Sequence, residues 1–377
     1  MIENPGILIT ILAFALVIGP LVFLHELGHY LAGRWFGVKA EEFAVGFGRE
    51  VAGYTDKRGT RWKFGWMPLG GYVRFAGDMN PASQPSPEWL SLPAHERAQT
   101  FQSKPLWQRA IIVAAGPVTN FLIAIAILGA FALFYGQNNT PAVIGKVVPG
   151  SAAATAGLQP GDKILSIGGR AIGDFSDMAS YTLLHAGENV LIDFERAGEP
   201  QQVEAVIGVS QLKDRFGNVT KRGMLGIGPG EPVFEPVSLW QAPLIGVERT
   251  WGFVVMTVEG LGQIISGRIP VQELGGPLKI AQISGETLAM GPVELVGLIA
   301  LISINLGFIN LLPVPVLDGG HLLFYAVEAV RRKPVEPQVM EWAFRGGLVA
   351  ILALMLLVTF NDLGAFGVWR NLAGLIG

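Results

Sequence analysis

Four long apolar segments constrain this chain more than any other feature of its sequence. They cover roughly residues 6–30, 108–135, 293–317 and 347–368, and a helix of about 20 apolar residues is enough to cross a bilayer. Because lipid offers no hydrogen-bond partner, such a segment must satisfy its own backbone as an α-helix. The mean hydropathy of +0.44, with 50% hydrophobic and 15% charged residues, also indicates a polytopic α-helical membrane protein.

The charged residues indicate how these helices are oriented and which partners are excluded. Lys and Arg crowd residues 37–109 and recur over 331–345, so the positive-inside rule places both regions in the cytoplasm and residues 136–292 outside. The net charge of −3 and the pI of 6.0 offer no basic field for nucleic acid. The chain has no cysteine, so a metal would have to be held by His, Asp or Glu.

The first apolar segment ends in HELGH, which places His25, Glu26 and His29 beside lipid. Ionisable groups at such a position are costly and indicate a functional site. His25 and His29 are four residues apart, so on a helix they project from one face. HExxH on a helix is a zinc-protease motif in which the glutamate acts as general base. The alternative is a pair of interfacial histidines, with Glu26 facing the lipid headgroups.

A catalytic zinc ion needs a third protein ligand and keeps a fourth position for water. The third apolar segment runs GFINLLPVPVLDGGHLLF and reaches Asp318 where its hydrophobic run ends. If only 108–135 crosses between them, the first and third segments run parallel, and Asp318 can lie at the depth of the two histidines. Two alternatives remain: Asp318 ends a helix or turn, or His321 is the third ligand.

Asn310 lies within the third apolar segment, where its amide needs a hydrogen-bond partner. That partner is either a neighbouring helix or the backbone of a substrate, and we favour the substrate. Pro313 and Pro315 should break the helix just beyond it and free backbone groups near the predicted metal. Irregular backbone at this depth is tolerated only inside protein or beside a water-filled cavity.

The segments between the helices have their own patterns. Residues 40–76 place Phe43, Val45 and Phe47, and then Trp62, Phe64 and Trp66, at alternate positions around TDKRG, which predicts a β-hairpin returning toward the membrane. Residues 78–105 are typical of a polar linker. Residues 237–265 repeat apolar side chains every three or four positions, but three charged residues interrupt them. We therefore expect a helix on the outer membrane surface, with a further crossing as the alternative.

These motifs together, HELGH in the first segment and NLLPVPVLDGG in the third, resemble the site-2 protease family of intramembrane zinc metalloproteases. AGPVTNF at 115–121, GWMPLGGYVRF at 65–75 and a PDZ-like stretch at 150–172 are similar to the bacterial branch typified by the regulator of sigma-E protease. The resemblance covers nearly the whole chain. It implies Zn²⁺ as cofactor, Glu26 as catalytic base, a substrate contact at Asn310, and metal ligands at His25, His29 and Asp318.

The resemblance also implies an activity and a location. Such proteases cleave transmembrane segments of membrane proteins, commonly a single-span anti-sigma factor after a site-1 cleavage has trimmed it, in regulated intramembrane proteolysis. The protein would lie in the bacterial inner membrane, with the PDZ domain in the periplasm and the active site toward the cytoplasm. This chain has room for one PDZ domain, whereas the best-known members of the branch carry two. The strand that resembles the carboxylate-binding loop, GMLGIGP at 223–229, comes last in this domain. A non-catalytic PDZ-bearing scaffold and an ion transporter remain alternatives.

The expected architecture is therefore a polytopic α-helical membrane protein with a membrane-associated β-hairpin and an inserted extracytoplasmic PDZ domain. Its expected parts are a first transmembrane helix with HExxH (1–36), a cytoplasmic region with the hairpin (37–105), a second transmembrane helix (106–135), the PDZ domain (136–230), amphipathic helices on the periplasmic membrane surface (231–292), a third transmembrane helix with the LDG motif (293–330), and a cytoplasmic loop with the fourth transmembrane helix (331–377).

Overall fold

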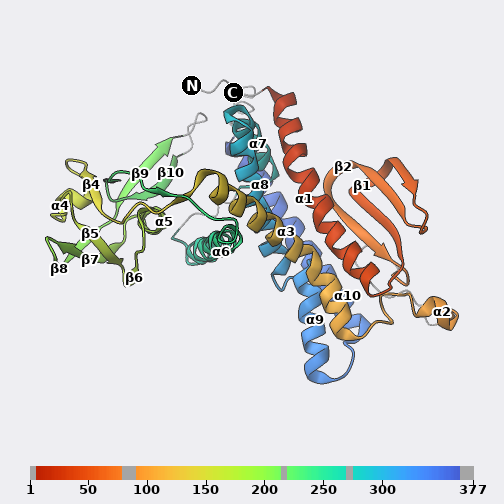
Figure 1. Ribbon diagram of the computed structural model, residues 1–377. Helices are drawn as coiled ribbons and strands as arrows, with labels where there is room; N and C mark the ends of the chain where they lie inside the picture. The colour runs from red at the N-terminus through yellow and green to blue at the C-terminus, as the bar shows by residue number, and fades with distance from the viewer. Residues whose placement is uncertain (1–5, 79–90, 214–218, 269–274, 366–377) are drawn as a thin grey trace, which may run out of the picture. The chain divides into compact units, whose positions relative to one another are not determined.

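The computed structural model describes residues 6–78, 91–213, 219–268 and 275–365 (Figure 1). The chain forms two compact units. The first contains Met1–Leu128, Gly246–Val254 and Leu274–Asp362, and the second contains Gly129–Ile245, Val255–Glu273 and Leu363–Gly377. Each unit has a hydrophobic core of its own.

Four helices in the described residues are long and apolar enough to cross a membrane, as the sequence predicts. They are α1 (Ile7–Trp35), α3 (Leu106–Tyr135), α8 (Pro292–Leu311) and α10 (Pro337–Ala365). The last helix begins at Pro337 rather than near residue 347, and residues 366–368 of its predicted span lie outside the described residues.

The stretch expected as one transmembrane helix over 293–330 is divided into two helices. α8 ends at Leu311, and α9 (Asp318–Arg331) begins at Asp318. Pro313 and Pro315 lie in the break, as expected from their missing N–H groups and fixed φ. The metal-ligand candidate Asp318 therefore belongs to the first turn of a new helix.

The first unit also contains a β-hairpin, formed by β1 (Ala40–Thr55) and β2 (Arg61–Phe75), which pair antiparallel. Asp56 shapes the turn, because its Oδ1 accepts the backbone N–H groups of Arg58 and Thr60. Both strands double back, so the register places 40–45 between 61–64 and 71–75. The hairpin lies beside α1 (Figure 1), and its association with a membrane stays a prediction.

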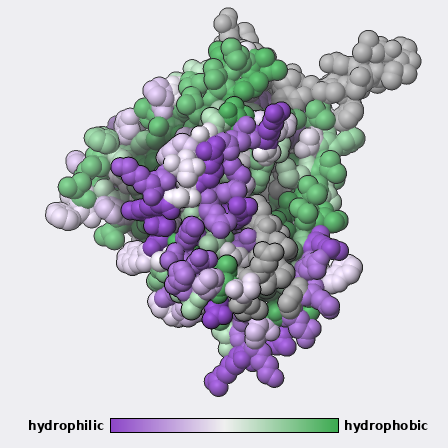
Figure 2. All heavy atoms as spheres, turned by 90° about the vertical axis from the view of Figure 1, so that its right-hand side faces the viewer, coloured by the Kyte–Doolittle hydropathy of each residue, from purple (hydrophilic) through white to green (hydrophobic). Residues whose placement is uncertain are grey.

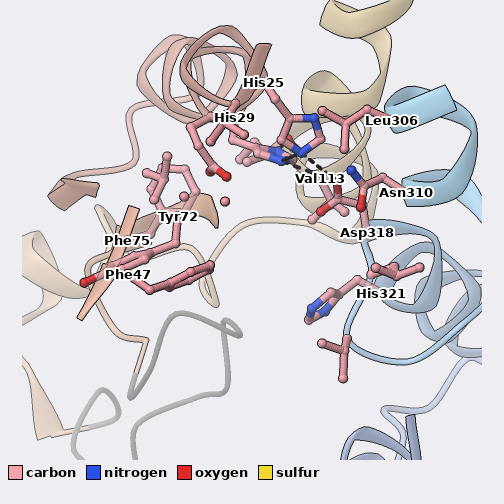
Figure 3. Close-up of a pocket in the computed structure, with 18 of the residues that line it drawn as sticks. His25, His29, Phe47, Tyr72, Phe75, Val113, Leu306, Asn310, Asp318 and His321 are labelled. Carbon is pink, nitrogen blue, oxygen red and sulfur yellow. Dashed lines mark hydrogen bonds and ion pairs between the residues drawn. The ribbon is translucent and has the colours of Figure 1, made fainter. Parts of the chain in front are cut away.

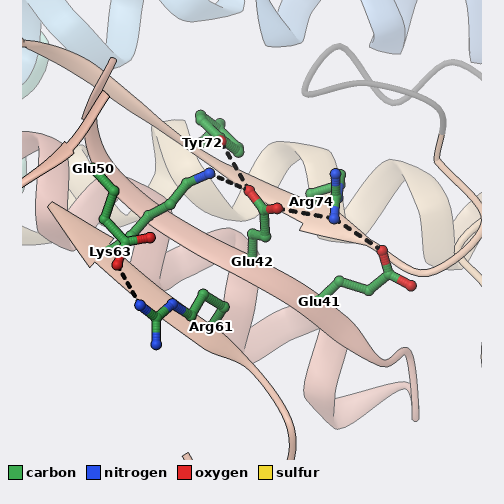
Figure 4. Close-up of polar contacts among 7 residues, drawn as sticks. All are labelled: Glu41, Glu42, Glu50, Arg61, Lys63, Tyr72 and Arg74. Carbon is green, nitrogen blue, oxygen red and sulfur yellow. Dashed lines mark hydrogen bonds and ion pairs between the residues drawn. The ribbon is translucent and has the colours of Figure 1, made fainter. Parts of the chain in front are cut away.

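The two faces of the hairpin differ in polarity. One face joins the hydrophobic core around Tyr30 of α1 through Phe43, Val73 and Phe75. In Figure 2, which faces the hairpin side, hydrophilic side chains gather near the centre of the view, below a hydrophobic region. Figure 4 shows the ion pairs of the polar face, which join Glu41, Glu42, Glu50, Arg61, Lys63 and Arg74.

Glu42 is the centre of this polar face. Its carboxylate accepts hydrogen bonds from Lys63 and from the Tyr72 hydroxyl, the latter at 2.9 Å, and pairs with Arg74 at 2.9 Å. Burial raises the pKa of Glu42. The hydrogen bonds from Lys63 and Tyr72 and the charges of Arg74 and Lys63 lower it by a larger amount, so the pKa of Glu42 lies below the usual value.

Two further helices lie in the first unit, and a third is divided between the two units. The short α2 (Ala94–Arg97) lies within the predicted linker. α7 (Pro277–Met290) packs on α1 and α8, and its first N–H groups donate to the Asp362 carboxylate of α10, from Gly276 and Lys279 at 3.1 Å each. α6 (Ala242–Ile265) is not among the membrane-crossing candidates. Its exposed apolar side chains include Leu244, Val247, Trp251, Val258 and Ile265. The location of this helix on the membrane surface stays a prediction.

The second unit centres on a four-stranded sheet in the order β6-β5-β7-β8. Its strands are β5 (Lys163–Ile167), β6 (Arg170–Ala171), β7 (Asn189–Arg196) and β8 (Glu199–Val206). The helices α4 (Ala152–Thr155) and α5 (Phe175–Leu184) contribute Ala153 and Met178 to a core dominated by isoleucine.

Three small strand pairs flank this sheet. They are β4 (Ile144–Val147) with β11 (Ile227–Pro229), β9 (Gly208–Lys213) with β10 (Val219–Met224), and β3 (Gln137–Asn138) with β12 (Phe234–Glu235). The GMLGIGP segment is divided between β10 and β11, because Gly226 between them has a φ of +76°. The PDZ interpretation of this unit stays a prediction.

Candidate metal centre

The HELGH residues all lie on α1, about two turns before its C-terminal end. The four-residue spacing places both imidazoles on one side of the helix, and their Nε2 atoms are 3.2 Å apart. His25 and Glu26 are buried, with 7% and 8% of their surfaces exposed. This part of the predicted site is therefore assembled by a single helix.

Asp318 completes the cluster from the opposite end of the sequence. Its Oδ2 lies 3.3 Å from His25 Nε2 and 3.5 Å from His29 Nε2. The two glycines that follow it allow this position. A Cβ on Gly319 would lie 2.3 Å from the carbonyl oxygens of Leu311 and Leu312, and one on Gly320 would lie 2.4 Å from that of Val314. The LDGG motif thus folds the start of α9 against the break after α8.

Helix α3 packs against both histidine rings, and the sequence patterns do not predict this contact. Gly116 is essential to it, because a Cβ there would lie 2.2 Å from His29 Nε2 and 2.8 Å from His25 Nε2. His29 Nδ1 donates to the Ile112 carbonyl at 2.9 Å, and Asn120 contacts His25 Nδ1 at 2.9 Å. In the sequence, AGPVTNF stands out only because it is similar to a stretch of the site-2 protease family. The contacts of α3 with the histidines use a backbone carbonyl and the absence of a Cβ, and neither leaves a distinctive residue pattern.

The cluster fits a tetrahedral metal with nitrogen and oxygen ligands. Two atoms bound at about 2.0–2.1 Å to tetrahedral zinc lie about 3.3–3.4 Å apart, and the three observed separations are 3.2, 3.3 and 3.5 Å. Asp318 Oδ2 is buried without a hydrogen bond, as expected for an atom that a cation would satisfy. Among the described residues, His25, His29 and Asp318 form the group of His and acidic side chains whose ligand atoms lie close enough together to hold one metal ion.

These residues line a cavity of about 460 Å³ within the first unit. Figure 3 shows His25, His29 and Asp318 pointing toward one another, with Asn310 beside Asp318 and the hairpin residues Tyr72 and Phe75 across the cavity. Glu26 also lines this cavity, and within the described part of the chain its carboxylate makes no hydrogen bond. It is therefore available to a water molecule or a substrate.

His321, the alternative ligand, lines the same cavity but lies apart from the three-residue cluster (Figure 3). Its ring packs against Phe344, with the ring centroids 4.9 Å apart. The geometry therefore favours Asp318 over His321 as the third ligand.

The strand β2 passes directly over Glu26. Gly71 makes this possible, because a Cβ there would lie 2.9 Å from Glu26 Cγ and 3.0 Å from Val22 Cγ1. The hairpin segment 71–75 has 40–45 on one side, and in the described residues no strand pairs with its other edge. Gly70, Gly71, Tyr72 and Val73 line the cavity, so this edge adjoins the candidate site.

The model of the family described as peptidase family M50 matches residues 13–354. The chain belongs to peptidase family M50. A relative in Agrobacterium fabrum, provisionally named as a zinc metalloprotease, is 42% identical over 360 residues, which cover 94% of this chain and 96% of the relative. The metalloprotease MmpA of Caulobacter vibrioides is 37% identical over 397 residues and covers 98% and 99% of the two chains.

This M50 family member is thus a zinc metalloprotease with four candidate membrane helices. A solved PDZ domain of an SdrC-like protein from Listeria monocytogenes matches 25% of the chain and 90% of its own length, at 21% identity. Its TM-score of 0.19 is too low to support an argument about the second unit.

Proposed function

We propose that this M50 protease hydrolyses a peptide bond within a membrane-spanning segment of another protein. The observation that carries the proposal is the position of HELGH inside α1, a helix apolar enough to cross a membrane. A protease of soluble substrates would have no reason to place buried ionisable groups there, because such groups are costly beside lipid. The site-2 type of activity is the one that uses this placement.

In the proposed site, His25, His29 and Asp318 hold zinc, and Glu26 is the general base. Zinc, when bound, acts as a Lewis acid toward the scissile carbonyl and lowers the pKa of the attacking water. Glu26 takes a proton from that water and passes it to the leaving amide nitrogen. Both roles of Glu26 are supported by its burial, its place in the cavity and its carboxylate without a hydrogen bond in the described residues.

The substrate must be extended before it can be cut, since a helix hides each amide in a backbone hydrogen bond. The unpaired edge of the hairpin segment 71–75 can receive it as an added strand. This edge supports the proposal because it runs beside Glu26. Asn310, at the other side of the cavity, then donates its amide to the substrate backbone.

The proposed location is the bacterial inner membrane, with the active site toward the cytoplasm and residues 136–230 in the periplasm. The distribution of Lys and Arg supports this orientation. The proposed substrate is a single-span protein, such as an anti-sigma factor, after site-1 cleavage. The candidate catalytic residues His25, Glu26, His29 and Asp318 all belong to the first unit, and we assign to the PDZ-like module a role in admitting trimmed substrates rather than in the chemistry.

Purified protein reconstituted into liposomes can test the proposal. Its zinc content is measured together with cleavage of a labelled single-span segment that carries a short outer domain. Mass spectrometry of the products should place the cut inside the apolar part of the segment. Cuts confined to the polar flanks, or equal cleavage of a soluble peptide, would show a metalloprotease that does not work within the membrane.

A further inference from the structure

Asn120 on α3 is a fully buried amide with one hydrogen-bond contact in the described residues. Its Nδ2 lies 2.9 Å from His25 Nδ1, its side chain has no exposed surface, and its Oδ1 is buried without a partner. An amide in such an interior costs free energy that an apolar side chain of the same size would not. The contact with His25 is therefore its distinguishing feature.

A histidine that binds a metal through Nε2 must carry its proton on Nδ1, and that N–H needs an acceptor. His29 meets this requirement, since its Nδ1 donates to the Ile112 carbonyl at 2.9 Å. For His25, the Asn120 amide occupies the corresponding place. The two ends of an amide have the same shape, and a half-turn presents Oδ1 to His25 Nδ1 as the required acceptor.

We propose that Asn120 is a positioning residue for zinc: its amide oxygen accepts the Nδ1–H of His25 and thereby fixes the tautomer and ring orientation that present Nε2 to the metal. The inference rests on the proposed role of His25 as a ligand. It assigns a task to AGPVTNF beyond helix packing, because Gly116 makes room for the rings and Asn120 orients one of them.

The surroundings of Asn120 hold it in place. Its backbone carbonyl accepts the Ser303 hydroxyl of α8 at 2.8 Å, and both groups are buried. Gly307, one turn further along α8, approaches so closely that a Cβ there would lie 3.3 Å from Asn120 Cβ. α8 therefore packs directly over the amide, and its position relative to His25 is set by three helices.

The test compares three variants of the full-length protein in detergent. Asn120→Leu keeps the size but removes the acceptor, Asn120→Asp keeps an acceptor, and Val118→Ala changes an exposed side chain of the same helix as the control. Zinc affinity is measured by chelator competition, and the visible spectrum of the Co²⁺-loaded protein reports ligand geometry. We expect zinc affinity to fall about 10–100-fold in Asn120→Leu, with an altered Co²⁺ spectrum, and to stay within about threefold of wild type in the other two.

Wild-type zinc affinity and spectrum in Asn120→Leu would overturn the proposal, as would equal losses in Asn120→Leu and Asn120→Asp. If Asn120→Leu does not fold, Asn120→Asp decides alone: retained affinity supports the proposal, and a loss as large as that of His25→Ala overturns it. Absence of zinc from the wild-type protein would be a different result, because it would remove the proposed function itself.

Discussion

Asp318 Oδ2 lies 3.3 Å from His25 Nε2, although the two residues come from opposite ends of the chain. The contact joins the C-terminal part of the first apolar helix to the first turn of α9. It depends on a break after α8 that ends one helix and starts another, and on glycines that tolerate close backbone contact. The candidate metal centre is therefore a product of chain topology as much as of motif.

The first prediction concerns Glu26. Glu26→Gln keeps the shape of the side chain but removes the base, so cleavage of a transmembrane segment should fall about 10²–10⁴-fold while zinc content stays unchanged. Elemental analysis and a gel-based cleavage assay measure the two quantities. Cleavage near the wild-type rate would exclude Glu26 as the general base.

The second prediction separates the two candidates for the third ligand. Asp318→Asn should weaken zinc binding about tenfold or more, because a neutral amide is a poorer ligand than a carboxylate that faces two imidazoles. His321→Ala should retain zinc, since His321 lies outside the cluster. Chelator competition checks both variants, and the opposite pattern would assign the ligand to His321.

The third prediction concerns the space beneath the histidines. Gly116→Ala should lower zinc affinity at least about tenfold, because its Cβ would occupy the position 2.2 Å from His29 Nε2. Gly19→Ala is the matched control, since nothing lies within 4 Å of a Cβ at that position of α1. Equal zinc affinity in the two variants would show that α3 does not support the metal centre.

The fourth prediction concerns the effect of pH on the hairpin. The net pKa of Glu42 is lowered in the folded state, so its stabilising effect is present above its unfolded pKa of about 4.3 and is lost as the pH falls through the folded value. Glu42→Gln should lower stability by roughly 1–2 kcal/mol at pH 7, and melting curves should show less further loss below about pH 4.3.

Glu336→Gln, at an exposed position, is the control for Glu42. It should melt as the wild type does at each pH. Parallel losses of melting temperature in wild type and Glu42→Gln across pH 3–5 would contradict the assigned role of Glu42.

The fifth prediction concerns the second unit. The ends of 141–230 already meet, because β3 pairs with β12 and Thr140 Oγ1 accepts the Val233 N–H at 3.2 Å. Replacing 141–230 by a short Gly-Ser linker should therefore leave zinc content and cleavage of a short-ectodomain substrate close to wild type. Cleavage of an untrimmed substrate should increase. Loss of short-substrate cleavage in a folded, zinc-loaded protein would assign this unit to the chemistry.

Several features follow from the sequence alone because they depend on neighbours along the chain. Apolar length predicts the four candidate membrane helices, and helical periodicity places His25 and His29 on one face. Pro313 and Pro315 mark the helix break for the same local reason. The two motifs are also local, because HELGH and LDGG are each a run of consecutive residues.

Other features were decided by tertiary structure, because they depend on groups that carry no distinctive residue pattern. The Ile112 group that accepts the His29 Nδ1–H is a backbone carbonyl, which every residue type has. The space at Gly116 exists because glycine lacks a Cβ atom. The proximity of Asp318, rather than His321, to the two histidines depends on the fold of the break after α8, since both residues stand within one turn of α9. The edge of 71–75 beside Glu26 exists only because the hairpin doubles back, and strand pairing over such separations is set by packing rather than by local sequence.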